Sequence, residues 1–72
     1  MENKELIDLS VKYNLNSSEL SKLVNLMYQI DIHDSSSPLF GRIADYVCEM
    51  KLLDMPAELL VEELKRKGLI SD

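Results

Sequence analysis

The lone histidine of this chain sits between two carboxylates, a combination that could bind a metal ion or transfer a proton. His33 stands in the run DIHD, beside Asp31 and Asp34. Either chemistry needs further converging ligands or a nucleophile, and the sequence offers none beside this run. We therefore predict that DIHD is a solvated polar loop. Gly41 and Gly68 are isolated and form no phosphate-binding loop, so we predict a protein that is not an enzyme and that has no cofactor or metal.

Cys48 is the only cysteine, and it lies at the edge of the apolar stripe of residues 40–50. The nucleophilic form of a cysteine is the thiolate, which burial disfavours. No histidine lies near Cys48 in sequence, so we predict an inert, buried thiol in preference to a reactive one. A single thiol fits a reducing compartment, and the N-terminus lacks a signal sequence, so we predict a cytoplasmic protein.

The overall composition limits the partners that this chain can take. Its 72 residues carry 13 acidic and 8 basic side chains, for a net charge of -5, and 46% of them are hydrophobic. The apolar fraction indicates one folded domain over residues 1–72 rather than a disordered chain. An acidic surface repels phosphate backbones and favours basic or apolar partners. The apolar runs are too short to cross a membrane.

Apolar residues recur at helical spacing through the chain, and no segment alternates as a strand would. We predict an all-α domain of four short helices over about residues 4–13, 17–29, 38–50 and 56–67, arranged as two helical hairpins. The second helix is expected to bury Leu20, Leu23, Val24, Met27, Tyr28 and Ile30, and the third Phe40, Ile43, Ala44, Val47 and Met50.

The boundaries of these helices carry local signals. Asn14 tolerates the left-handed backbone that ends a helix sharply. Asn16 is a good N-cap, and Glu19 three residues later completes the pattern of a capping box. Ser37 followed by Pro38 marks the start of the third helix in the same way.

The segment LIDLSVKYNLNSSELSKLVNLM, residues 6–27, resembles a helix-turn-helix motif. Ser10 takes the small inward position usually held by Ala, and Asn14 takes the turn position usually held by Gly. The resemblance implies a recognition helix over residues 17–29, whose polar side chains could bond base edges or phosphates. Those side chains are Ser17, Ser18, Ser21, Lys22, Asn25 and Gln29. Because this helix has one cation and no Arg, we prefer a corner that simply packs two helices.

The C-terminal stretch LVEELKRKGLI resembles the end of the recognition helix in winged-helix proteins, but the chain ends at Asp72, where the β-wing is expected to begin. The basic residues 65–67 could contact phosphates. We prefer the alternative of a solvated helix end, in which Glu62 pairs with Arg66 and Glu63 pairs with Lys67 one turn later.

The connection before the last predicted helix carries more apolar surface than one small core needs. Leu53 and Leu59 both fall off the apolar stripes of their helices, and Pro56 restrains the backbone between them. We predict a docking surface made of Leu52, Leu53, Met55 and Leu59, with an acidic rim that includes Glu49, Glu58 and Glu62. The alternative is that this connection packs under the first helix.

The predicted function follows from this surface and from the net charge. We expect a small acidic protein–protein interaction module that acts by stoichiometric binding, as an inhibitor, adaptor or regulatory subunit. Small regulators of bacteria and phages are similar in size and composition. The expected partner is a protein with a basic or apolar surface, or a second copy of this chain in a homodimer. A helix-turn-helix regulator that binds DNA is the alternative.

Overall fold

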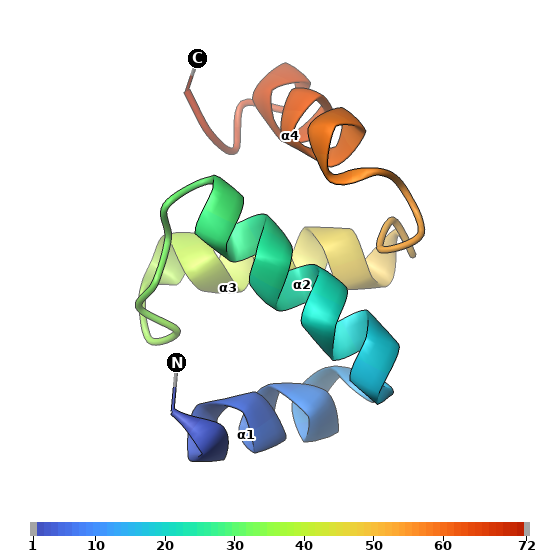
Figure 1. Ribbon diagram of the computed structural model, residues 1–72. Coiled ribbons are helices and arrows are strands. Elements are labelled where there is room, and N and C mark those ends of the chain that lie inside the picture. The colour runs from blue at the N-terminus through green and yellow to red at the C-terminus, as the bar shows by residue number, and fades with distance from the viewer. Residues whose placement is uncertain (1, 72) are drawn as a thin grey trace.

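The computed structural model describes residues 2–71. Within them the chain forms four α-helices and no strand: α1 Asn3–Tyr13, α2 Ser17–Gln29, α3 Pro38–Glu49 and α4 Ala57–Arg66. The prediction of an all-α domain made of two helical hairpins is therefore confirmed. In Figure 1, α2 crosses the middle of the molecule between α1 and α4, and α3 runs behind it.

The starts of α2 and α3 are fixed by side-chain caps. The side chain of Asn16 accepts a hydrogen bond of 2.8 Å from the backbone N–H of Glu19, whose carboxylate accepts one of 3.0 Å from the backbone N–H of Asn16. At α3 the Ser37 hydroxyl accepts a hydrogen bond from the backbone of Phe40, and Pro38 occupies the first turn. Both predicted caps are therefore confirmed. Each cap accepts a hydrogen bond from a backbone N–H that the helix leaves unpaired.

All four helices end in the same backbone turn. A residue with a left-handed backbone follows each helix, and the N–H of the next residue bonds to the carbonyl five positions earlier, as in a Schellman motif. The left-handed residues are Asn14, Asp31, Lys51 and Gly68, with φ of 55°, 59°, 56° and 77°. The closing bonds join Leu15 to Ser10, Ile32 to Met27, Leu52 to Val47 and Leu69 to Leu64, at 2.8 to 3.0 Å. Each turn thus folds an apolar residue back against the core.

The core is built around α2, and it corrects the predicted buried face of that helix. Leu26 is 1% exposed, whereas Tyr28 is 53% exposed. The buried side of α2 is rotated toward Leu26 because the α3–α4 connection and α4 pack there, bringing Leu53 and Leu60 beside it. The described core comprises Leu9, Leu23, Leu26, Met27, Phe40, Ile43, Ala44, Val47, Leu53, Leu60 and Leu64.

Side-chain hydrogen bonds tie the helices together at the surface. The hydroxyl of Tyr13 on α1 donates to Asp45 on α3, and the hydroxyl of Tyr46 on α3 donates to Glu63 on α4. Neither contact is fully buried, so each adds a modest amount to the packing of the core. No helix within residues 2–71 combines the length and the apolar content that a membrane crossing requires.

Candidate interaction surface

Three apolar side chains of the α3–α4 hairpin are exposed or half-buried, and we call them the hairpin patch: Met50, Met55 and Leu59. The hydrogen bond of 2.9 Å from Tyr46 to Glu63 sets the register of the two helices. Met50 lies one turn beyond Tyr46, and Leu59 lies one turn before Glu63, so both lie toward the connection that joins α3 to α4. Met50 is 59% exposed and Leu59 is 54% exposed. Met55 is half-buried and lines a shallow hollow with Leu59.

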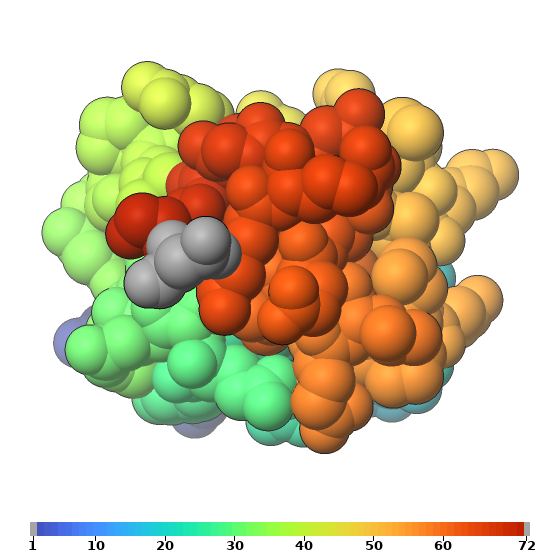
Figure 2. Space-filling view, turned by 90° about the horizontal axis from the view of Figure 1, so that it is seen from above, coloured from blue at the N-terminus to red at the C-terminus, as the bar shows by residue number. Residues whose placement is uncertain are grey.

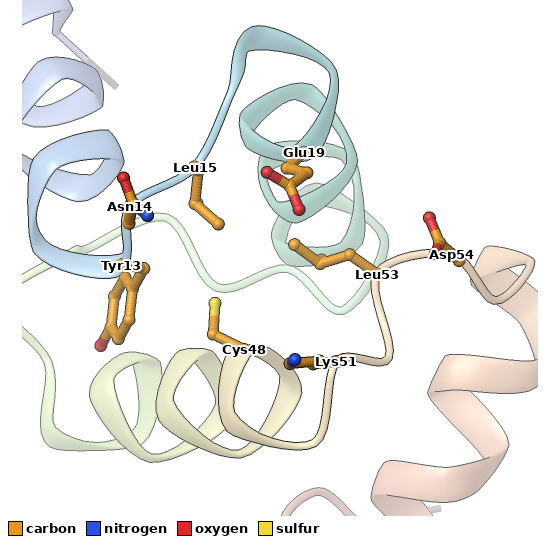
Figure 3. Close-up of a pocket in the computed structure, with 8 residues that line it drawn as sticks. All are labelled: Tyr13, Asn14, Leu15, Glu19, Cys48, Lys51, Leu53 and Asp54. Atoms are coloured by element: carbon orange, nitrogen blue, oxygen red, sulfur yellow. The ribbon is translucent and has the colours of Figure 1, made fainter.

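The structure corrects the predicted role of Leu53. Its side chain is 6% exposed and belongs to the core, so it cannot contact a partner while the domain is folded. The prediction continued the helical period past Glu49, but α3 ends there and Lys51 turns the chain back. Figure 3 shows the side chain of Leu53 directed toward the α1–α2 corner. Met50, the C-cap residue of α3, was expected to be buried but is 59% exposed.

The three carboxylates of the predicted rim are exposed. Glu49 and Glu58 are exposed, and Glu62 is exposed beside the hollow that Met55 and Leu59 line. Leu52 is half-buried and packs against the core, so it contributes little free apolar surface. The structure thus brings together Met55, Leu59 and Glu62 of the predicted surface and removes Leu53 from it.

One carboxylate near the hairpin patch serves the fold instead. Glu63 accepts hydrogen bonds from the Arg66 guanidinium at 2.7 and 3.0 Å and from Tyr46 at 2.9 Å. The bonds from Arg66, and after them the bond from Tyr46, lower the pKa of Glu63. The predicted pair of Glu62 with Arg66 is wrong, because Arg66 pairs with Glu63, which also accepts the bond from Tyr46. This network clamps α4 against α3.

The predicted recognition face of α2 is open to solvent. Its one cation, Lys22, lies 3.4 Å from a carboxylate oxygen of Asp54 in the α3–α4 connection. That carboxylate offsets the charge that would approach a phosphate. The six side chains predicted for this face are all exposed: Ser17, Ser18, Ser21, Lys22, Asn25 and Gln29.

His33 and Cys48, whose side chains could take part in chemistry, are not arranged as a reactive or metal-binding site among the described residues. Nε2 of His33 lies 2.7 Å from a carboxylate oxygen of Asp31, and both side chains are exposed. Within residues 2–71 no group of three His, Cys, Asp or Glu side chains converges to hold a metal ion. Cys48 is half-buried, and burial together with Asp45 and Glu19 raises the pKa of its thiol. At neutral pH these effects disfavour the thiolate.

Sequence reasoning missed a second surface, which meets the hollow of Met55 and Leu59 at Lys65. A hollow of about 640 Å³ lies where the C-terminal ends of α2 and α4 meet the start of α3. The residues that line it are Gln29, Ile30, Ile32, Leu39, Val61, Lys65, Gly68, Leu69, Ile70 and Ser71. Helical periodicity could not reveal it, because most of these residues lie at or beyond helix ends. The signal available in the sequence was an apolar residue directly after each helix-ending turn, here Ile32 after Asp31 and Leu69 after Gly68.

Comparison of the chain with protein-family models, with curated proteins and with solved structures finds no match.

Proposed function

We propose that this protein is a small acidic interaction module that binds a partner protein stoichiometrically through the hairpin patch. The observation that carries the proposal is the exposure of Met50 and Leu59 on one hairpin of a chain with net charge -5. Large apolar side chains exposed on a small domain are typical of a binding surface. Such a module would act as an inhibitor, an adaptor or a regulatory subunit.

The charges around the hairpin patch define the partner. Glu49, Glu58 and Glu62 are exposed, so a partner that covers Met50 and Leu59 brings its own rim against carboxylates. A basic rim would be attracted and an acidic one repelled. Met50 and Met55 have flexible thioether side chains that adapt to the shape of an apolar partner. We infer that the partner presents an apolar surface flanked by Lys or Arg.

A pull-down from the native host tests this proposal with matched variants. Leu59→Asp places a charge in the hairpin patch, and Val11→Asp makes the same change at an exposed apolar position on α1. We expect the unchanged chain and Val11→Asp to retain one stoichiometric partner that Leu59→Asp loses, with equal helicity in all three by circular dichroism. Equal retention by both variants would contradict the proposal.

Self-association is a competing use of the same surface. If a second copy covers the hairpin patch, sedimentation of the purified protein will give a dimer mass that Leu59→Asp reduces to that of a monomer. A monomer at high concentration, together with partner capture, favours a different protein as the occupant.

DNA binding is the second candidate function, because the polar residues of α2 face solvent at the position of a recognition helix. Against it stand the pairing of Lys22 with Asp54 and the net charge of -5. We expect no duplex to bind below micromolar concentration at physiological salt. Tight, salt-dependent binding that Lys22→Ala weakens would make DNA binding the leading function.

A further inference from the structure

The hollow between the ends of α2 and α4 has the composition of a binding site for an apolar ligand. Six of the residues that line it are aliphatic and half-buried: Ile30, Ile32, Leu39, Val61, Leu69 and Ile70. Its volume of about 640 Å³ falls within the range of roughly 300–1,000 Å³ that is common for small-molecule sites. Figure 2 shows the C-terminal segment (red) lying beside the segment that follows α2 (green).

Two helix-ending turns build the walls of this hollow. Asp31 and Gly68 have left-handed backbones, which return the chain after α2 and α4. The next residues, Ile32 and Leu69, are held by backbone bonds of 2.9 Å to Met27 and Leu64. Because these bonds fix the backbone, the apolar walls are formed before any ligand arrives, and little ordering entropy remains to be lost on binding.

The charged side chain among the described residues that line the hollow is a cation. Lys65 is half-buried and lines the hollow, and no carboxylate lies among the described residues around it. Asp31, next to the wall residue Ile32, directs its carboxylate to His33 at 2.7 Å. Lys65 also borders the hollow of Met55 and Leu59, where Glu62 and Glu63 lie. Toward the aliphatic walls it presents a cation, which favours a ligand with an anionic group.

We propose that this hollow binds an unbranched aliphatic chain that ends in a carboxylate, with the chain along the aliphatic walls and the carboxylate beside Lys65. The aliphatic walls include neither Met50 nor Leu59, although Lys65 borders the hollow of Leu59 as well, and the site does not depend on the proposed protein-binding function. The aliphatic walls supply affinity, and Lys65 selects the anionic head group.

An NMR titration of the ¹⁵N-labelled protein tests this site with sodium decanoate, kept below its micelle concentration. We expect concentration-dependent shifts at the amides of residues 30–32, 61–65 and 68–70. Hexanoate should bind more weakly, by roughly twofold to fourfold for each methylene removed. Decyltrimethylammonium has the same chain with a cationic head group, and it should bind more weakly than decanoate.

Two lysine variants separate the head-group contact from the general charge of the helix end. Lys65→Met keeps the aliphatic stem and removes the charge, and it should weaken decanoate binding by about twofold to fivefold. Lys67→Met makes the same change at an exposed position outside the hollow, and it should leave binding unchanged.

Four results would each overturn the proposal. They are equal binding of the anionic and cationic chains, shifts centred on the hairpin patch, equal weakening by the two lysine variants, and shifts at the hollow that grow with protein concentration alone. The last would show that a second copy of the chain occupies the hollow. The first two results use the unchanged protein, so they decide the matter even if Lys65→Met fails to fold.

Discussion

Truncation of Leu53 and Leu59 to alanine should affect the stability of this domain very differently. Leu53 lies in the α3–α4 connection and Leu59 lies in the first turn of α4. Leu53 is 6% exposed, whereas Leu59 is 54% exposed. The pair therefore compares a core position with a surface position at constant chemistry. It also checks the correction that places Leu53 in the core.

The expected loss for Leu53→Ala follows from its burial. A buried methylene contributes about 0.8 kcal/mol, so the carbons lost in this change account for roughly 2 kcal/mol. Leucine truncations in cores cost about 2–5 kcal/mol once the remaining cavity is included. Leu53 also lines a hollow of about 380 Å³ between the corner and the connection, which leaves less new enclosed space. We therefore expect a loss of about 2–3 kcal/mol.

Leu59→Ala should cost much less. Its side chain is more than half exposed, so less than half of the transfer free energy is lost. Alanine has a higher helix propensity than leucine, which offsets a few tenths of a kcal/mol. We expect a net change below about 1 kcal/mol in the free energy of unfolding.

Urea and thermal unfolding followed by far-UV circular dichroism measure both values. For a domain of this size 1 kcal/mol shifts the melting temperature by about 4–8 °C, so Leu53→Ala should melt roughly 10–20 °C lower than the unchanged protein. Equal losses, or a larger loss for Leu59→Ala, would refute the placement of these two side chains. An unchanged dependence on urea concentration is needed to attribute the difference to stability.

Three further predictions concern local contacts. Asn16→Ala removes the cap of α2 and should cost about 1 kcal/mol in urea unfolding, whereas Asn25→Ala on the exposed face of α2 should be nearly neutral. The pKa of Glu63 is lowered from 4.5 in the folded state, so its contribution to stability is present above that pH and lost as the pH falls through the lowered value. Glu63→Gln should therefore give a shallower loss of urea stability below about pH 4.5, and an identical pH profile would contradict the clamp. The thiol of Cys48 should react with a thiol reagent more slowly in the folded than in the unfolded protein at neutral pH, because burial raises its pKa.

The positions of the helices were determined by the sequence itself. Asn16 with Glu19 and Ser37 with Pro38 start helices through bonds to backbone groups at most three residues away. Asn14 ends α1 by a comparably local bond. These contacts depend on residues close together in the chain, so the pattern of residue types is enough to predict them. The turns at Asp31 and Lys51 were missed because these residue types signal a left-handed backbone less strongly than glycine does.

Only the tertiary structure decided which side chains past a helix end face the core. Helical periodicity placed Met50 inside and Leu53 outside, and the structure reverses both. Leu53 follows the turn at Lys51, beyond which the direction of the chain no longer follows the helix. The exposure of Tyr28 depends in the same way on where α4 packs against α2. The hollow at Lys65 joins segments some forty residues apart, from 29–32 to 68–71. No local pattern encodes such a meeting, since it arises only when the packed core brings the helix ends together.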